Sequence, residues 1–411
     1  MLLTNFAYTD ELLDLFSKEL FMSSSQALYT QIFAMLRTLH PDTHLTRLAN
    51  WVWVIVGLIQ ARSVHLSEMA THIPGPAKAA GRIMKIRRWL SNSHITTRTF
   101  YEPIIQQVLL GWIGRDVTIM LDGCFVNGEA LQMLRLSLSH CYRALPLAWE
   151  VVATAGLVEL TVCEAMLEYV AKLLTRTRRV TFLADRGFRD RDWARKCRTL
   201  GWDYIIRIAN NTYITFNDGR QIALDQLRVK PGQRRYFPNV RLTREADWCC
   251  NIAITWTRAT PKCPAELCVV MTNLHADGWV LRHYLKRMHI EESFRDEKSG
   301  GFSLEATHLT DPKRLDTLLL AIAVAVLWIY EIGEQVIGDE RRTEIDPGYK
   351  RQLSVFQLGW RQLRRAVSCA VLPAITLILR PFKPEPVYNR RLKPVAPEPA
   401  GVSPQATMEK C

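Results

Sequence analysis

The sequence has little of what marks a secreted or membrane-inserted chain. Its ten cysteines form no C-x-x-C pair, so we expect free thiols in a reducing cytosol rather than a disulfide framework or a zinc knuckle. The first residues, MLLTNFAYTDELLDLF, carry acids early and lack a basic-then-apolar secretory pattern. The longest apolar run, residues 318–330, is too short to span a bilayer and predicts a core helix. We therefore expect a cytoplasmic protein with no membrane partner.

Acidic residues are fewer than basic ones. The 411 residues include 53 Lys and Arg against 40 Asp and Glu, which gives a net charge of +13. Otherwise the composition is that of an ordinary globular protein, with 48% hydrophobic and 23% charged residues, and the length predicts two or three domains. The positive charge favours a polyanionic partner, nucleic acid ahead of an anionic membrane.

Residues 1–105 are predicted to be helical, with helices at 10–20, 45–61 and 77–90. A Pro-Gly-Pro break at 74–76 precedes the last of these helices. Helix, tight break and basic helix are typical of a helix-turn-helix-like unit that enters a DNA groove. A plain helical bundle with a solvated basic face fits the same pattern. The cations of the last helix that lie off its apolar face are Lys78, Arg82, Lys85 and Arg88.

From residue 116 the pattern indicates a mixed α/β sheet. Apolar strands at 117–121 and 180–184 end in Asp122 and Asp185. Further strands are predicted at 133–139, 145–152 and 203–209, with helices at 159–174 and 190–202. Residues 210–273 predict a β-rich insertion that begins with a hairpin turning at Asp218 and Gly219.

Helices follow at 315–330 and 354–367, and the proline-rich residues 381–411 predict a disordered tail. The predicted organisation is therefore a helical DNA-binding region (1–105), a catalytic domain (106–209 and 274–335) interrupted by the β-rich insertion (210–273), a C-terminal helical region (336–380) and the tail.

The stretch 284–298, YLKRMHIEESFRDEK, is predicted to form one amphipathic helix of about four turns. At about 100° per residue, Tyr284, Arg287, Glu291 and Lys298 fall within roughly 60° of each other. A carboxylate among phosphate-binding groups suits a helix that approaches both a metal and a nucleic-acid backbone. An ordinary charged surface helix explains this stretch, taken alone, equally well.

Three carboxylates combine into a candidate site. Asp122 and Asp185 each follow an apolar strand, at the edge where sites form in open α/β sheets. A single Asp there is usually a turn residue, but two of them together with Glu291 predict a site for hard cations, Mg²⁺ with Mn²⁺ as a substitute. Two such ions activate a water or a 3′-hydroxyl for attack on a phosphodiester. Histidine is not prominent at these positions, which speaks against zinc there.

The order Asp122, Asp185, Glu291, with a β-rich segment before the glutamate, resembles the catalytic DDE set of bacterial insertion-sequence transposases. Tyr284-x2-Arg287-x3-Glu291-x6-Lys298 matches all four positions of the Y-x2-R-x3-E-x6-K motif of one large cut-and-paste group. The ADRGF around Asp185 and the FSLEATHLTD after the helix are also similar to that family. The resemblance covers roughly residues 110–370, and the helical N-terminal region more loosely.

The resemblance implies a ribonuclease-H-like mixed sheet with a β-rich insertion and an all-helical N-terminal DNA-binding region. It implies that Asp122, Asp185 and Glu291 hold two divalent metals, and that the DNA backbone is contacted by Tyr284, Arg287 and Lys298. Such a chain binds terminal inverted repeats, cleaves the element ends and joins 3′-hydroxyls to target DNA. The implied partner is double-stranded DNA, bound by a homodimer in the bacterial cytoplasm without a nucleotide cofactor.

Two features depart from the family pattern. Cys124 stands where relatives often have a hydroxyl residue, two positions after the first Asp. Relatives also stack a Trp on a flipped base, and here Trp248 and Trp256 are candidates without matched spacing. Two other functions remain open: a ribonuclease-H-like nuclease that cuts without joining, and a catalytically inactive DNA-binding regulator, against which the intact acidic triad argues.

Overall fold

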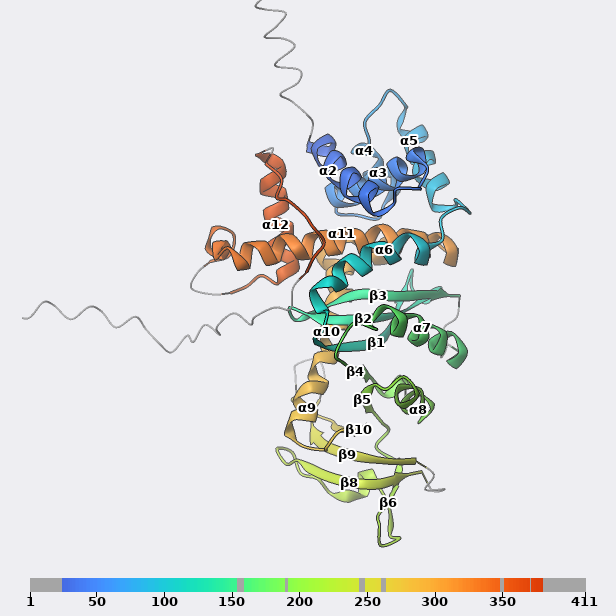
Figure 1. Ribbon diagram of the computed structural model, residues 1–411, viewed down its shortest axis with the longest axis vertical. Helices are drawn as coiled ribbons and strands as arrows, with labels where there is room; N and C mark the ends of the chain where they lie inside the picture. The colour runs from blue at the N-terminus through green and yellow to red at the C-terminus, as the bar shows by residue number, and fades with distance from the viewer. Residues whose placement is uncertain are drawn as a thin grey trace, which may run out of the picture.

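A computed structural model of the protein describes residues 24–153, 159–188, 191–243, 248–259, 264–347, 351–369 and 371–379. The helix expected at 10–20 and the disordered tail expected at 381–411 lie outside these residues. Helices gather at one end of the molecule, and a sheet extends away from them (Figure 1).

The N-terminal part is helical wherever it is described. Its helices are α2 (Ser24–Leu39), α3 (Leu45–Ala61), α4 (Leu66–Thr71), α5 (Ala79–Leu90) and α6 (Thr97–Leu109), the last followed by the short turn η1 (Leu110–Trp112). The helices predicted at 45–61 and 77–90 are confirmed, whereas α2 and α6 were not predicted. Helix α3 is apolar on most sides because it packs between α2, α4 and the core helix α11 (Pro312–Gly338).

The central part of the chain is a mixed α/β sheet, as predicted. Its first strands are β1 (Asp116–Val126), β2 (Leu131–His140), β3 (Arg143–Val152), β4 (Arg179–Ala184) and β5 (Asp203–Arg207). Strands β1 and β4, and β4 and β5, pair in parallel, whereas β1–β2 and β2–β3 pair antiparallel. Helices α7 (Leu160–Leu173) and α8 (Arg191–Thr199) connect the parallel strands, with the turn η2 (Arg186–Phe188) after β4.

The β-rich segment continues the same sheet. Its elements are β6 (Tyr213–Thr215), β7 (Gln221–Ala223), η3 (Leu224–Leu227), β8 (Arg235–Leu242), β9 (Trp248–Trp256) and β10 (Leu267–Thr272). Because β10 pairs antiparallel with β5, ten strands form one sheet in the order β3-β2-β1-β4-β5-β10-β9-β8-β6-β7. Strand β8 was not predicted: its sequence contains Pro238 at a register shift and alternates poorly.

Helix α11 is the central helix of the core. Asp311 caps its N-terminus through its side chain, and Pro312 takes the first helical position. By length and composition α11 could cross a membrane, but 94% of its most apolar window is buried inside the protein, as the predicted core helix requires. The helix continues past the predicted domain boundary at residue 335 to Gly338.

Two glycines allow helix α12 (Val355–Ser368) to cross α11 closely, the two being connected through η7 (Arg341–Glu344). A Cβ atom on Gly359 would lie 1.8 Å from the carbonyl oxygen of Ile329, and one on Gly333 would lie 2.1 Å from that of Val355. Any side chain at either position would force the helices apart. The middle and second half of helix α12 carry the cations Arg361, Arg364 and Arg365.

A buried ion pair fastens helix α10 (Met288–Glu297) to the sheet. Arg135 of β2 and Glu297 of α10 are each 1% exposed, and Arg135 Nη2 donates to Glu297 Oε2 over 2.8 Å in a bidentate contact. The Arg135 guanidinium also lies 5.2 Å from the Phe294 ring centre. The neighbouring acids Glu292 and Asp296 pair instead with Arg143 of β3.

Breaking this pair is expected to be costly, because it leaves the Arg135 charge buried without a partner. Glu297→Gln should lower the free energy of unfolding by about 3–5 kcal/mol, measured as a shift of the urea midpoint. Glu292→Gln on the same helix is the control: its ion pairs are more exposed and should matter by less than about 1 kcal/mol. Equal losses in the two variants would contradict a special role for the buried pair.

Candidate active site

The two predicted aspartates lie side by side at the end of the β1–β4 ladder. The prediction that Asp122 ends its strand was wrong, because β1 runs on to Val126 through antiparallel pairing with β2. The parallel pairing with β4, however, stops at Leu121 and Ala184. Asp122 and Asp185 therefore each follow the last residues that pair across these two strands.

Backbone amides orient both carboxylates. The Gly123 amide donates to Asp122 Oδ1 over 2.8 Å, and the Gly187 amide donates to Asp185 Oδ1 over 2.7 Å. A Cβ atom on Gly187 would lie only 3.0 Å from Asp185 Oδ1. The glycine of the ADRGF segment thus leaves room for this tight turn beside the carboxylate.

The stretch 284–298, predicted as a single helix, is divided among four elements, from the last residue of one helix to the first residue of a π turn. Helix α9 (Gly278–Tyr284) is followed by the 3₁₀ turn η4 (Leu285–Arg287), by α10, and by the π turn η5 (Lys298–Phe302) and the 3₁₀ turn η6 (Leu304–Ala306). A 3₁₀ turn advances by about 120° per residue instead of 100°, so it rotates Tyr284 away from the face that an ideal helix would give it. Tyr284 is 7% exposed and lies outside the pocket that the other three motif residues line.

One pocket of about 500 Å³ holds most of the predicted site. The predicted residues that line it are Asp122, Asp185, Arg287, Glu291 and Lys298. Glu292 and Glu297, acids of the same helix as Glu291, do not line it. Cys124, Phe294, Arg295, Ser299 and Glu305 complete the lining.

The Arg287 guanidinium lies between two of the carboxylates. Its Nη1 is 3.1 Å from Asp122 Oδ2, and its Nη2 donates to Glu291 Oε1. The Arg287 side chain is only 12% exposed. The single positive charge of Arg287 is therefore shared between two of the four carboxylates that line the pocket.

Asp122 resists ionisation. Burial raises the pKa of its carboxyl to about 6, and the charges of Asp185 and Glu291 act in the same direction, while Arg287 and the Gly123 amide oppose them. A carboxyl that is protonated below pH 6 gains from a cation that compensates its charge.

The donor set fits a hard divalent cation. The three predicted carboxylates and Glu305 line one open pocket whose described lining contains no imidazole, and oxygen ligands of this kind suit Mg²⁺ and Mn²⁺. Among the described residues, the side-chain atoms that already lie close enough to share one ion belong to another group, His140, Cys141 and Glu334. Because the Arg287 guanidinium lies between Asp122 and Glu291, it keeps these carboxylates apart.

The cations predicted to bind DNA lie in different surroundings. Lys298 pairs with Glu305 over 2.8 Å at the pocket wall. Of the four N-terminal cations, Arg88 lines a second pocket of about 670 Å³. Lys78 precedes α5 and is exposed, Arg82 donates to the carbonyl of Ala77, and Lys85 is exposed without lining either pocket.

This second pocket adjoins the first and adds cations that the sequence analysis did not select. Glu305 lines the first pocket, and the next residue, Ala306, lines the second. Arg87 and Arg314 join Arg88 in its lining, so a basic surface continues from Lys298 toward α5. Arg314 belongs to the first turn of α11, and only the folded chain brings it near α5.

The two tryptophans considered for base stacking are engaged in packing. Trp248 is 8% exposed and lies beneath the guanidinium of Arg198, 4.1 Å from its ring centre. The Trp256 indole donates to the carbonyl of Val229. Trp279, which the sequence analysis did not select, is 44% exposed and stacks on His283 at the start of α9.

One comparison with known families finds a match. The family model described as "Transposase DDE domain" matches residues 161–328, less than half of the chain, and this segment includes Asp185 and Glu291 but not Asp122. No curated protein sequence matches the chain. The match supports a DDE transposase at this general level.

Divalent-cation binding should depend on pH through Asp122. Because its pKa is about 6, protons compete with the metal below pH 6, and Mn²⁺ affinity should rise as the pH increases from 5 to 7. Titrations of the metal-free protein followed by the electron paramagnetic resonance of free Mn²⁺ measure this. Asp122→Asn should bind more weakly and lose the pH dependence near 6; an unchanged profile would refute the assignment.

Proposed function

We propose that this protein is a cut-and-paste DNA transposase whose catalytic carboxylates are Asp122, Asp185 and Glu291. It binds the terminal inverted repeats of its element, cleaves the ends and joins the 3′-hydroxyls to target DNA. The observation that carries the proposal is the pocket itself: three carboxylates from β1, the end of β4 and α10 line one cavity together with two motif cations. Its general class follows from the family match.

The three carboxylates would hold two Mg²⁺ ions, for which Mn²⁺ substitutes. When bound, the ions supply a nucleophilic water or 3′-hydroxyl and stabilise the leaving oxygen of the phosphodiester. The pocket opens to solvent, as a site that admits a DNA strand must. Asp122 and Asp185 are held by backbone amides, and Glu291 is held by α10, so the donors start from fixed positions.

Arg287 has two tasks in this proposal. Before the metals bind, its guanidinium balances the charges of Asp122 and Glu291. With divalent ions held by the carboxylates, the guanidinium would be free to form bidentate contacts with a phosphate of the DNA backbone. Lys298 would likewise give up its ion pair with Glu305 and bind a phosphate of the DNA backbone.

The DNA path follows from the adjoining pockets. The element end enters the carboxylate pocket, and the duplex continues over Arg87, Arg88 and Arg314 toward α5 and the N-terminal helices. Lys78, Arg82 and Lys85 extend this basic surface, and Tyr284 supports Arg287 from the buried side. A homodimer that pairs two ends completes the assembly.

Removing any one carboxylate should abolish cleavage and leave DNA binding largely intact. Asp122→Ala, Asp185→Ala and Glu291→Ala each remove a metal ligand without removing a phosphate contact. A cleavage assay on a terminal-repeat duplex with Mg²⁺ or Mn²⁺, run beside a gel-shift assay, measures the two properties separately.

Glu292→Ala is the matched control for Glu291, because it removes the neighbouring carboxylate, which does not line the pocket and pairs with Arg143 and Arg295. It should keep near-normal cleavage. The site assignment fails if any triad variant cleaves normally, or if Glu292→Ala is as inactive as Glu291→Ala.

Lys298→Ala should weaken binding to the element end by removing one phosphate contact. The slope of log affinity against log salt should become shallower by about 1. Lys172→Ala is the control, since this exposed lysine of α7 lines neither pocket. Identical slopes for wild type and Lys298→Ala would count against a phosphate contact there.

A ribonuclease-H-like nuclease and an inactive regulator are the competing functions. Pre-cleaved element ends with free 3′-hydroxyls separate the first from a transposase, because only a transposase joins them to a target plasmid. The absence of any Mg²⁺- or Mn²⁺-dependent cleavage by the wild-type protein would favour the regulator.

A further inference from the structure

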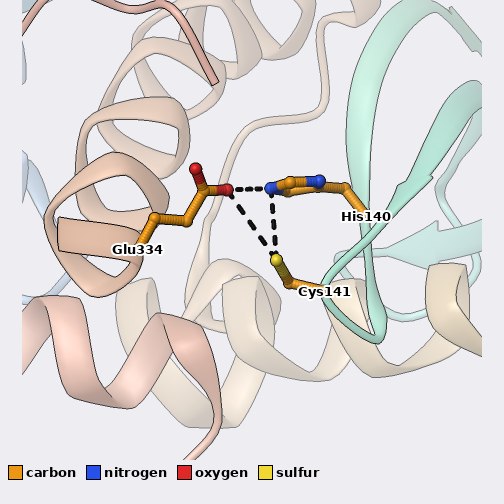
Figure 2. A group of neighbouring side chains, drawn as sticks. All are labelled: His140, Cys141 and Glu334. Atoms are coloured by element: carbon orange, nitrogen blue, oxygen red, sulfur yellow. Dashed lines mark hydrogen bonds and ion pairs between the residues drawn. The ribbon is translucent and has the colours of Figure 1, made fainter. Parts of the chain in front are cut away.

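Three side chains of different chemistry converge at the turn between β2 and β3, away from the carboxylate pocket. His140 ends β2, Cys141 follows it in the turn, and Glu334 projects from α11, as Figure 2 shows. Their ligand atoms all lie within 4.8 Å of one another. The site is separate from the DDE pocket, because Asp122 pairs with Arg135, five residues earlier on β2 than His140.

The distances between these atoms approach those of a tetrahedral metal site. Cys141 Sγ lies 3.3 Å from His140 Nε2 and 3.8 Å from Glu334 Oε1, and the His140 ring is hydrogen-bonded to the Glu334 carboxylate. Zinc bonds of 2.0–2.3 Å at tetrahedral angles separate the ligand atoms by about 3.5 Å. A small shift of the Glu334 carboxylate away from the ring would therefore open room for an ion.

The donor types select the metal. One imidazole nitrogen, one thiolate and one carboxylate are a recognised ligand set for Zn²⁺, whereas Mg²⁺ prefers oxygen ligands alone. A thiolate and a carboxylate together carry two negative charges, so Zn²⁺ would leave this half-buried site neutral. The thiol proton passes to solvent on binding, and a water completes the fourth position.

The backbone of the turn places Cys141 at some cost. The two turn residues, Cys141 and Tyr142, have φ of +48° and +61°, the conformation of a type I′ turn that Asn-Gly adopts most readily. The turn thereby brings the sulfur back toward α11, where Glu334 and His140 meet it (Figure 2). His140 is 4% exposed and rests against the edge of the Trp112 ring, which fixes the imidazole.

We propose that His140, Cys141 and Glu334 form a Zn²⁺ site of three protein ligands that fastens the β2–β3 turn to α11. The site is distinct from the catalytic metal site in ligands and in preferred ion. Strand β2 also carries Arg135, which binds Glu297 of α10. A fixed β2–β3 turn would therefore hold the edge of the sheet and the core helix α11 in a constant relative position.

The test uses Co²⁺ as a spectroscopic substitute for Zn²⁺ on the chelator-treated full-length protein, with excess Mg²⁺ present to occupy the carboxylate pocket. The expected result is tetrahedral d–d absorption and a thiolate-to-Co²⁺ charge-transfer band at one equivalent, both removed by added Zn²⁺. Cys141→Ser should lose the charge-transfer band. Cys124→Ser, in the DDE pocket, and Cys249→Ser, exposed on β9, should keep it.

Glu334→Gln keeps the size of the side chain and serves as the second variant, with circular dichroism to confirm folding. It should weaken Zn²⁺ binding by about tenfold or more, since even outer partners of metal ligands contribute that much. Zn²⁺ should raise the unfolding temperature of the wild type but not of Cys141→Ser. The proposal is overturned if no charge-transfer band forms, if the band survives Cys141→Ser, or if Cys124→Ser removes it. None of these outcomes depends on whether the protein cleaves DNA.

Discussion

The candidate site depends on one buried ion pair, that of Arg135 and Glu297. Residues opposite each other on neighbouring antiparallel strands share a face of the sheet, so Arg135 stands beside Asp122. Glu297 belongs to the same helix as Glu291, less than two turns further on. By binding Glu297, Arg135 sets the distance and rotation of α10 against β1 and so places the third carboxylate near the first. A buried pair with two hydrogen bonds holds this geometry more strictly than apolar packing alone, because neither charge can leave without an uncompensated partner.

The charged residues in and just before α10 make two kinds of contact. Glu297 and Asp296 bind arginines of β2 and β3, whereas Glu291, together with Arg287 of the preceding turn η4, lines the pocket. Arg287 holds the place of a cation between two carboxylates, which lowers the cost of keeping Asp122 buried. Under the proposed function, this arginine would stabilise the pocket in the metal-free protein and would be available to bind a phosphate once metal is held.

Local patterns in the sequence predicted most of the helices and strands and identified the three candidate carboxylates. Apolar runs predicted β1, β4 and α11, and helical spacing distinguished Glu291 from Glu292. What could not be predicted depends on contacts between distant segments: the continuation of β1 past Asp122 requires β2, and the joining of β10 to β5 turns an expected insertion into one sheet. Arg135 gives no signal in an otherwise apolar strand until Glu297, 162 residues later, is placed beside it. Arg314 and the break at η4 were missed for the same reason.

Strand β2 contributes both to the carboxylate pocket and to the proposed Zn²⁺ site. At its centre Arg135 fixes the helix of the carboxylate pocket, and at its end His140 and Cys141 meet Glu334 of α11. Arg314, in the first turn of α11, lines the second pocket. Helix α11 also packs against the N-terminal helices. A bond at the β2–β3 turn would therefore tie together the sheet that carries Asp122, the helix that carries Glu291 and the surface over which DNA is proposed to run. Stabilising this turn would therefore fix the positions of the sheet, the helix and the basic surface relative to one another. Stabilising the distant strands β6–β8 would leave those positions unchanged.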